Sequence, residues 1–425
     1  MVPRHDMPHT IPRMDRKIVA AWASYDFANS VFSAVIMATV FSVYFADVVV
    51  GNDAGLGDLW WGRVLSTSML IVALSSPVLG SVSDRAGVRK RMLFAYTTVC
   101  VGCVALFPTI APGMILWGYA LAVLANIGFE GALVYYNAYL PDIAPPDRQG
   151  FVSGIGFGTG YAGSAAGLLI SLPLVARGWL DFTWWSVAAF FALFSVPALA
   201  MLPADRRGTQ GVLRAAASGV TRFKQLASDV LKQRDLRRFL LSFFVYIDGV
   251  NTTIYFAAIF AKTTLGFTLQ ELIPLFLLIQ LSALAGSFAL ARPTDVWGPK
   301  RTITLTLVLW TAIAGLAYFV TTKGEFVLIA VLAGTGLGAV QAASRALMSE
   351  LIPKGKEAQM FGFYAFCGKS SSVVGPLVFG EISHALGGNQ RVAVLSVVAF
   401  FLVGLLLLQR VHDPRSRSSR PDGRT

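Results

Sequence analysis

The chain has 425 residues, of which 55% are hydrophobic and only 14% are charged, and its mean hydropathy is +0.63. A soluble domain needs a largely polar surface, so this composition excludes a soluble globular protein and indicates an integral membrane protein. The net charge of +12 would suit nucleic-acid binding, but its distribution along the chain follows membrane topology instead.

Apolar runs long enough to cross a bilayer as helices recur along the whole sequence. The first run is too long for the core of a cleavable signal, and the polar residues 1–17 precede it, so we expect it to remain as a span. The runs predict twelve membrane-spanning helices, at about residues 18–46, 62–83, 92–110, 113–140, 149–173, 182–202, 239–261, 270–291, 302–321, 325–350, 358–386 and 390–409.

The longest polar segment divides these twelve helices into six and six. We expect a tail at 1–17, a first six-helix half at 18–202, a basic linker at 203–238, a second half at 239–410 and a disordered basic tail at 411–425. Lys and Arg gather before helix 1, after helix 2, in the linker and in the last tail, whereas the loops on the other side carry few. This positive-inside bias predicts that both termini are cytoplasmic, and the basic segments are expected to touch anionic lipid rather than nucleic acid.

Helix 1 contains the sequence SYDFANS at Ser24–Ser30. A carboxylate at membrane depth is energetically costly, so Asp26 indicates a polar, water-accessible site. Asn29 lies three positions later, on the same face of the helix.

Helix 2 is followed by the sequence DRAGVRK, from Asp84 to Lys90. Gly80 permits close approach of helices, and Asp84 can accept hydrogen bonds from the start of a neighbouring helix. Membrane topology alone requires the basic residues but neither Asp84 nor Gly87, so the motif indicates more than a purely topological role.

The three cysteines, Cys100, Cys103 and Cys367, all lie in predicted spans, which indicates neither a disulfide framework nor a metal site. Helix 5 carries glycines at 154, 156, 158, 160, 163 and 167. Such a series permits close helix packing and bending.

Three sequence motifs occur in both halves, in the same order. Asp26-x-x-Asn29 on helix 1 corresponds to Asp248-x-x-Asn251 on helix 7. The D-x-x-G-x-basic-basic motif after helix 2 returns after helix 8 as Asp295–Arg301, and LPDIAP after helix 4 corresponds to MSELIP after helix 10. Three matches on equivalent helices indicate a duplicated six-helix unit, and such repeats place substrate and coupling ions at their interface near mid-membrane.

With these motifs, the chain resembles the major facilitator superfamily over residues 18–410. Trp22–Ser30 resembles the helix 1 signature of the vacuole effluxer family, whose fungal members export amino acids from the vacuole. The resemblance implies an all-α fold of two pseudo-symmetric six-helix halves. It also implies that the loop after helix 2 latches the halves together, with Asp84 at the start of helix 11 and Arg85 or Arg89 reaching Asp142. The latch candidates in both halves are Gly80, Asp84, Arg85, Gly87, Arg89, Asp142, Asp295, Gly298, Lys300, Arg301 and Glu350.

Five ionisable residues lie deep inside predicted helices, roughly 9 to 17 Å from the cytoplasmic helix ends at 1.5 Å per residue: Asp26, Glu130, Asp248, Arg345 and Lys369. They are candidates for substrate binding or proton coupling together with Asn29 and Asn251, and the repeat predicts that the two Asp-x-x-Asn faces are opposite each other across the cavity. Structural ion pairing is the alternative. Polar or aromatic candidates for the cavity lining are Tyr25, Tyr135, Tyr136, Asn137, Tyr255, Gln280, Gln341 and Tyr364.

Acids and bases at one depth suit a zwitterion, or a cation exchanged for protons. We therefore expect a monomeric secondary transporter in the inner membrane that moves a small amino-acid-like or zwitterionic solute by alternating access, with proton coupling and in the direction of efflux. A proton-coupled exporter of organic cations or drugs is one alternative, and a non-transporting receptor or assembly factor is another. The sequence shows no histidine cluster at depth, P-loop or G-x-S-x-G motif, so we expect neither an enzyme nor a cofactor.

Overall fold

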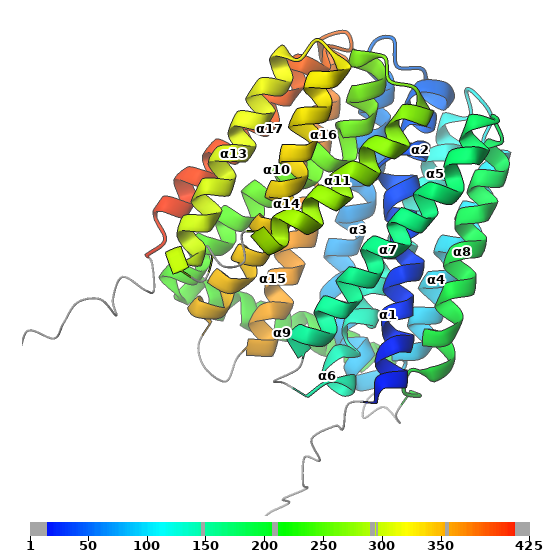
Figure 1. The fold of residues 1–425 in the computed structure, drawn as a ribbon. Coiled ribbons are helices and arrows are strands. Elements are labelled where there is room, and N and C mark those ends of the chain that lie inside the picture. Colours follow the sequence, from blue (N-terminus) through cyan, green and yellow to red (C-terminus); the bar gives the residue numbers. More distant parts are fainter. Residues whose placement is uncertain are drawn as a thin grey trace, which may run out of the picture.

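The computed structural model describes residues 15–145, 149–205, 211–289, 294, 296–352 and 357–412. Within these ranges every regular element is a helix (Figure 1). Asp295 and most of the two predicted tails lie outside the described residues, and so do the side chains of Asp84 and Arg85 and the surroundings of Gly80.

The first half begins with a helix that changes from α to π winding twice. It comprises α1 (Arg16–Val31), the π-helical η1 (Phe32–Met37), α2 (Val40–Val43) and the π-helical η2 (Tyr44–Val50). The half continues with α3 (Leu56–Ala86), α4 (Arg89–Ala105), η3 (Phe107–Thr109), α5 (Ile115–Asn137), α6 (Leu140–Ile143), α7 (Gln149–Ala176) and α8 (Leu180–Met201).

The second half begins with one long regular helix, α10 (Arg234–Leu265). It continues with α11 (Leu269–Ala289), α13 (Pro299–Phe319), α14 (Lys323–Leu351), α15 (Glu357–Ser371), α16 (Val374–Ala385) and α17 (Gln390–Gln409).

Ten helices among the described residues are long and apolar enough to cross a membrane. Two of the twelve predicted spans are not among these ten. The span 62–83 lies inside α3, and the span 358–386 is divided into α15 and α16 by a turn at Ser372 and Val373. Pro376 explains this interruption, because it has no N–H for the carbonyl of Ser372. The all-helical membrane fold is confirmed, whereas the count of twelve spans stays a prediction.

The helix packing repeats from one half to the other. In the first half α1 packs against α7 and α8, α4 against α5 and α8, and α3 against α5. In the second half, the equivalent pairs are α10 with α15, α16 and α17, α13 with α14 and α17, and α11 with α14. The halves lie side by side (Figure 1), and contacts of α3 with α16 and of α7 with α11 join them. This repetition supports two pseudo-symmetric halves, whereas six spans in each stay a prediction.

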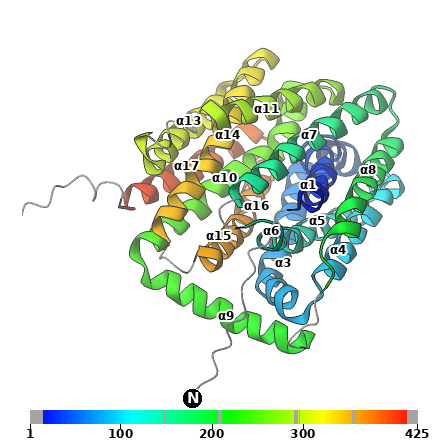
Figure 2. The same ribbon diagram turned by 60° about the horizontal axis from the view of Figure 1, so that its bottom comes forward.

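The predicted linker contains a helix that the sequence analysis did not anticipate, α9 (Val212–Lys232). It runs along one end of the bundle (Figure 2) and packs against α3 and α15. Its Phe223 ring lies 5.5 Å from that of Phe363 and 4.7 Å from that of Phe366. We call this end of the bundle the linker end. The opposite end, with residues 51–55 and 386–389, is the loop end.

Candidate functional site

An ion pair between two of the predicted deep residues joins the two halves. Lys369 on α15 places its Nζ 2.7 Å from Oε2 of Glu130 on α5, and it also donates to the Glu130 carbonyl at 3.2 Å. The Glu130 side chain is 10% exposed and that of Lys369 is 23% exposed. The two charges are therefore largely removed from solvent and neutralise each other in this state.

The two aspartates of the repeated motif have equivalent surroundings, and their position opposite each other across the cavity stays a prediction. Each turns toward the fifth helix of its own half, where a glycine makes room for it. Asp26 Oδ2 lies 2.6 Å from where a Cβ on Gly156 would be, and Asp248 Oδ1 lies 2.6 Å from the same point on Gly375. A larger residue at either glycine would displace the carboxylate.

The asparagines of the motif differ between the halves. Asn29 donates to Asp26 Oδ1 at 3.4 Å, whereas Asn251 donates to Ser372 Oγ at 2.7 Å. Asp248 accepts instead from the backbone N–H of Gly375 at 2.8 Å. This N–H lies in the first turn of α16, where backbone N–H groups have no acceptor within the helix. One oxygen of Asp248 therefore caps the N-terminus of α16.

Arg345 on α14 is the deep base without an acidic partner among the described residues. Its side chain is exposed, and its guanidinium carbon lies 4.6 Å from the ring centre of Phe157 on α7, a cation–π contact across the halves. Phe157 directly follows Gly156, which faces Asp26. A cation and a carboxylate therefore flank the same turn of α7.

Most of the predicted lining residues are packed in the helix bundle. The hydroxyl groups of Tyr25 and Thr97 are hydrogen-bonded, with their oxygens 2.7 Å apart. Tyr136 stacks on Trp22 with 4.6 Å between ring centres. Tyr364 stacks on Phe243 at 4.2 Å. Tyr135 is also buried, Tyr255 and Gln341 are half-buried, and Asn137 is exposed at the end of α5.

The D-x-x-G-x-basic-basic motif has a structural reason that applies in both halves. Gly87 and Gly298 have φ of 62° and 91°, a backbone region that favours glycine. Lys90 then donates to the carbonyls of Ala200 and Leu202 at the end of α8, at 3.1 and 2.9 Å. The second basic residue thus fixes the third helix of the half to the end of the sixth.

In the second half the corresponding contacts come from Lys300, the first basic residue of the motif there, which donates to the carbonyls of Gln409 and Val411 at 3.3 and 2.6 Å. The structure also contains the Arg89–Asp142 ion pair, with a distance of 2.6 Å. Both residues belong to the first half, so this pair does not by itself connect the halves. The latch role stays a prediction for this set, which also includes Arg301 and Glu350.

A buried acid at the loop end was missed by the sequence analysis. Asp58 on α3 is fully buried and accepts from Ser383 Oγ at 2.5 Å and from Gln390 Nε2 at 2.8 and 2.9 Å. Asn52 donates to it at 3.0 Å and to Thr263 Oγ1 at 3.2 Å. Ser383, Gln390 and Thr263 belong to the second half, so Asp58 connects the halves at this end.

The helices that carry this network are also packed backbone to backbone. A Cβ on Gly62 of α3 would lie 2.4 Å from the Pro376 carbonyl oxygen, and one on Gly380 of α16 would lie 2.7 Å from the Asp58 carbonyl oxygen. Hydrogen bonds and close packing together close the loop end in this state.

We expect Asp58→Ala to open the loop end, because it leaves buried donors of Asn52, Ser383 and Gln390 without their acceptor. The measurement is the distance between spin labels on Asp53→Cys and Leu386→Cys, in a protein without its native cysteines. A longer distance component should appear.

The matched control is Glu381→Gln, which breaks the nearby pair of Arg63 with Glu381 at 3.2 Å. Both side chains of that pair are exposed, at 41% and 49%, so its loss should change the distances little. An unchanged distance distribution in Asp58→Ala would show that the Asp58 network is not what closes the loop end.

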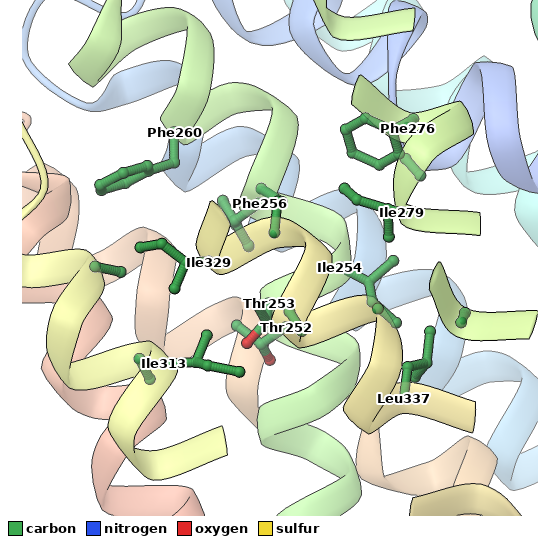
Figure 3. Close-up of a pocket in the computed structure, with 18 of the residues that line it drawn as sticks. Thr252, Thr253, Ile254, Phe256, Phe260, Phe276, Ile279, Ile313, Ile329 and Leu337 are labelled. Carbon is green, nitrogen blue, oxygen red and sulfur yellow. The ribbon is translucent and has the colours of Figure 1, made fainter. Parts of the chain in front are cut away.

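A separate cavity of about 280 Å³ lies mainly between helices of the second half (Figure 3). It is lined by residues of α10, α11, α13, α14, α16 and α17, with η1, Ala38 and α7 on one side. Of the predicted lining residues, Gln280 borders it. The described lining contains no charged side chain, so this cavity is distinct from the Glu130–Lys369 pair.

Comparisons with a family profile and with individual proteins both relate this chain to membrane transporters. Residues 63–150 and 147–420 match the sequence profile of the family described as "Vacuole effluxer Atg22 like". The uncharacterized MFS-type transporter YxiO of Bacillus subtilis is 28% identical over 409 residues, which cover 93% of this chain and 95% of YxiO. Autophagy-related protein 22 of Candida glabrata is 24% identical over 423 residues, which cover 89% of this chain and 77% of that protein.

Among solved structures, a POT family transporter in complex with 5-aminolevulinic acid superposes with a TM-score of 0.71 at 13% identity. The match covers 95% of this chain and 98% of that chain. At this identity the likeness concerns the fold alone.

Proposed function

The chain belongs to the vacuole effluxer Atg22-like family of MFS-type membrane transporters, and on this premise we propose that it moves a small amino-acid-like solute by alternating access. The observation that carries the proposal is the pair of opposite charges around one turn of α7. Arg345 has no acidic partner among the described residues and lies on Phe157, whereas Asp26 faces the adjacent Gly156. A zwitterion offers the complementary charges.

In this proposal Arg345 binds the substrate carboxylate and Asp26 its amine. Arg345 is a better candidate than Lys369, because Glu130 already neutralises Lys369. The related fold of a transporter in complex with 5-aminolevulinic acid, which carries an amine and a carboxylate, is compatible with such a ligand.

The transport cycle that we propose is coupled to protons and runs toward efflux. Asp26 and Asp248 are the proposed proton carriers, because carboxylates in a partly dry site bind and release protons as access alternates. We assign the linker end to the cytoplasm of a cell with this protein in its inner membrane, since the basic residues gather there. The contacts of Asp58 at the loop end must then break in each cycle.

The test is uptake of labelled amino acids into proteoliposomes under an imposed pH gradient. Arg345→Gln should weaken the apparent affinity for the transported amino acid about tenfold or more, because a charge-assisted hydrogen bond contributes about 1.5–3 kcal/mol. Arg391→Gln is the matched control, because Arg391 donates to the Tyr318 carbonyl at the loop end. Binding without any flux in the wild type would indicate a receptor instead.

A further inference from the structure

The cavity of the second half combines an aromatic wall with a small polar edge. Rings surround it on several helices, with Phe256 and Phe379 4.2 Å apart and Phe260 and Phe326 5.8 Å apart between ring centres. Trp310 contributes a further ring. Thr252 and Thr253 form part of the polar edge (Figure 3).

Two oxygens at this edge lack hydrogen-bond partners among the described residues. They are Oγ1 of Thr252, which lines the cavity, and Oδ1 of Asp248, one helical turn earlier. Both side chains are buried, at 0% and 1% exposure. The two oxygens are neighbours, because they lie 2.1 and 2.6 Å from the same point, the position of a Cβ on Gly375.

Unpaired buried polar atoms are uncommon in proteins and require an explanation. The other Asp248 oxygen is already used, since it accepts from the Gly375 N–H. An oxygen of a carboxylate and a hydroxyl oxygen side by side present acceptor capacity and negative charge. A ligand that donates hydrogen bonds satisfies the carboxylate oxygen of Asp248 and can also donate to the Thr252 hydroxyl, and a positive charge on that ligand complements the carboxylate.

The rest of the cavity selects the remainder of the ligand. Its aromatic faces attract cations and pack against apolar groups. No Lys or Arg is among the described residues that line it, so a ligand carboxylate would enter without a counter-charge. A carboxylate therefore counts against binding here.

From these observations we propose that the cavity is a second binding site, which takes an organic amine with a bulky apolar body and no carboxylate. The amine lies at Thr252 beside Asp248, and the apolar body lies among the rings. This site goes beyond the proposed transport of an amino-acid-like solute at Arg345 and does not depend on it.

The test uses phenylalanine and two ligands that each lack one of its groups. 2-Phenylethylamine lacks the carboxylate, and 3-phenylpropionate lacks the amine. Equilibrium binding is measured by titration calorimetry on the full chain in lipid nanodiscs. We expect 2-phenylethylamine to bind at this cavity, and 3-phenylpropionate not to bind there. Ala330→Phe, which fills the cavity, should abolish amine binding. Ala317→Leu adds less volume to the same cavity and should also reduce amine binding.

Asp248→Asn and Thr252→Val should each weaken amine binding about tenfold or more. Matched controls are Asp181→Asn and Thr183→Val on α8, which should not change it. Amine binding that survives both cavity-filling variants would overturn the proposal, and so would phenylalanine that competes for the cavity as well as the amine does. Either failure leaves the transport proposal intact, because amine binding in this cavity tests neither substrate binding at Arg345 and Asp26 nor proton binding at Asp248.

Discussion

Replacing Lys369 by alanine is expected to destabilise the protein by about 3–5 kcal/mol, the usual effect of breaking a buried ion pair. The reason is that Glu130 would keep its charge at membrane depth without the ammonium that now lies 2.7 Å away. The measurement is the melting temperature of the purified protein. The second substitution Glu130→Gln should restore much of the stability, because it removes the charge left without a partner.

A surface pair provides the control for this experiment. Lys323 and Glu271 are also 2.7 Å apart, but their side chains are 43% and 44% exposed, so Lys323→Ala should cost less than about 1 kcal/mol. If Lys369→Ala leaves stability unchanged and instead weakens carboxylate ligands, Lys369 belongs to the substrate site and the resident pair is dispensable.

Asn in place of Asp26 or Asp248 is expected to abolish uptake driven by a pH gradient while substrate exchange continues. For Asp26→Asn, exchange is measured at saturating substrate, because Asp26 also binds the substrate amine in the proposed site. Exchange needs no net proton movement, whereas accumulation requires a group that binds and releases the proton. Asn keeps an oxygen acceptor, so the contact of position 248 with the Gly375 N–H can survive.

The measurement compares pH-driven uptake with counterflow exchange in the same proteoliposomes. Loss of both activities in a variant would point to a folding or binding defect rather than to coupling. Normal pH-driven uptake in both single variants would refute the assignment of these carboxylates as proton carriers.

The sequence was sufficient for features whose cause is local or repeated. Apolar runs predicted the all-helical membrane fold, and the D-x-x-G-x-basic-basic motif marked equivalent positions because Gly87 and Gly298 both need positive φ. Lys90 and Lys300 contact equivalent helix ends, although they are the second and the first basic residue of the motif, respectively. A duplicated unit repeats its local requirements, so one sequence alone reveals them.

Features that depend on contacts between distant residues could not be read in this way. Asp58 bonds to Ser383 and Gln390, which are 325 and 332 residues away in the chain. No positively charged side chain pairs with Asp58 among the described residues, so the pattern of charges in the sequence did not indicate these contacts. The orientation of Asp26 and Asp248 depends on Gly156 and Gly375, whose roles appear only once the helices are packed.

The interrupted winding of the first helix makes the two halves mechanically unequal. Residues 16–50 alternate between α and π turns and break at Ala38 and Thr39, whereas the equivalent α10 is one regular rod of 32 residues. Wider turns leave a weak point where a helix can bend. The first half therefore has a joint beside the aromatic cavity, where Ser33, Ala34 and Ala38 lie against it. In the proposed transport cycle, we therefore expect the first helix to bend at this joint while α10 moves as one straight helix.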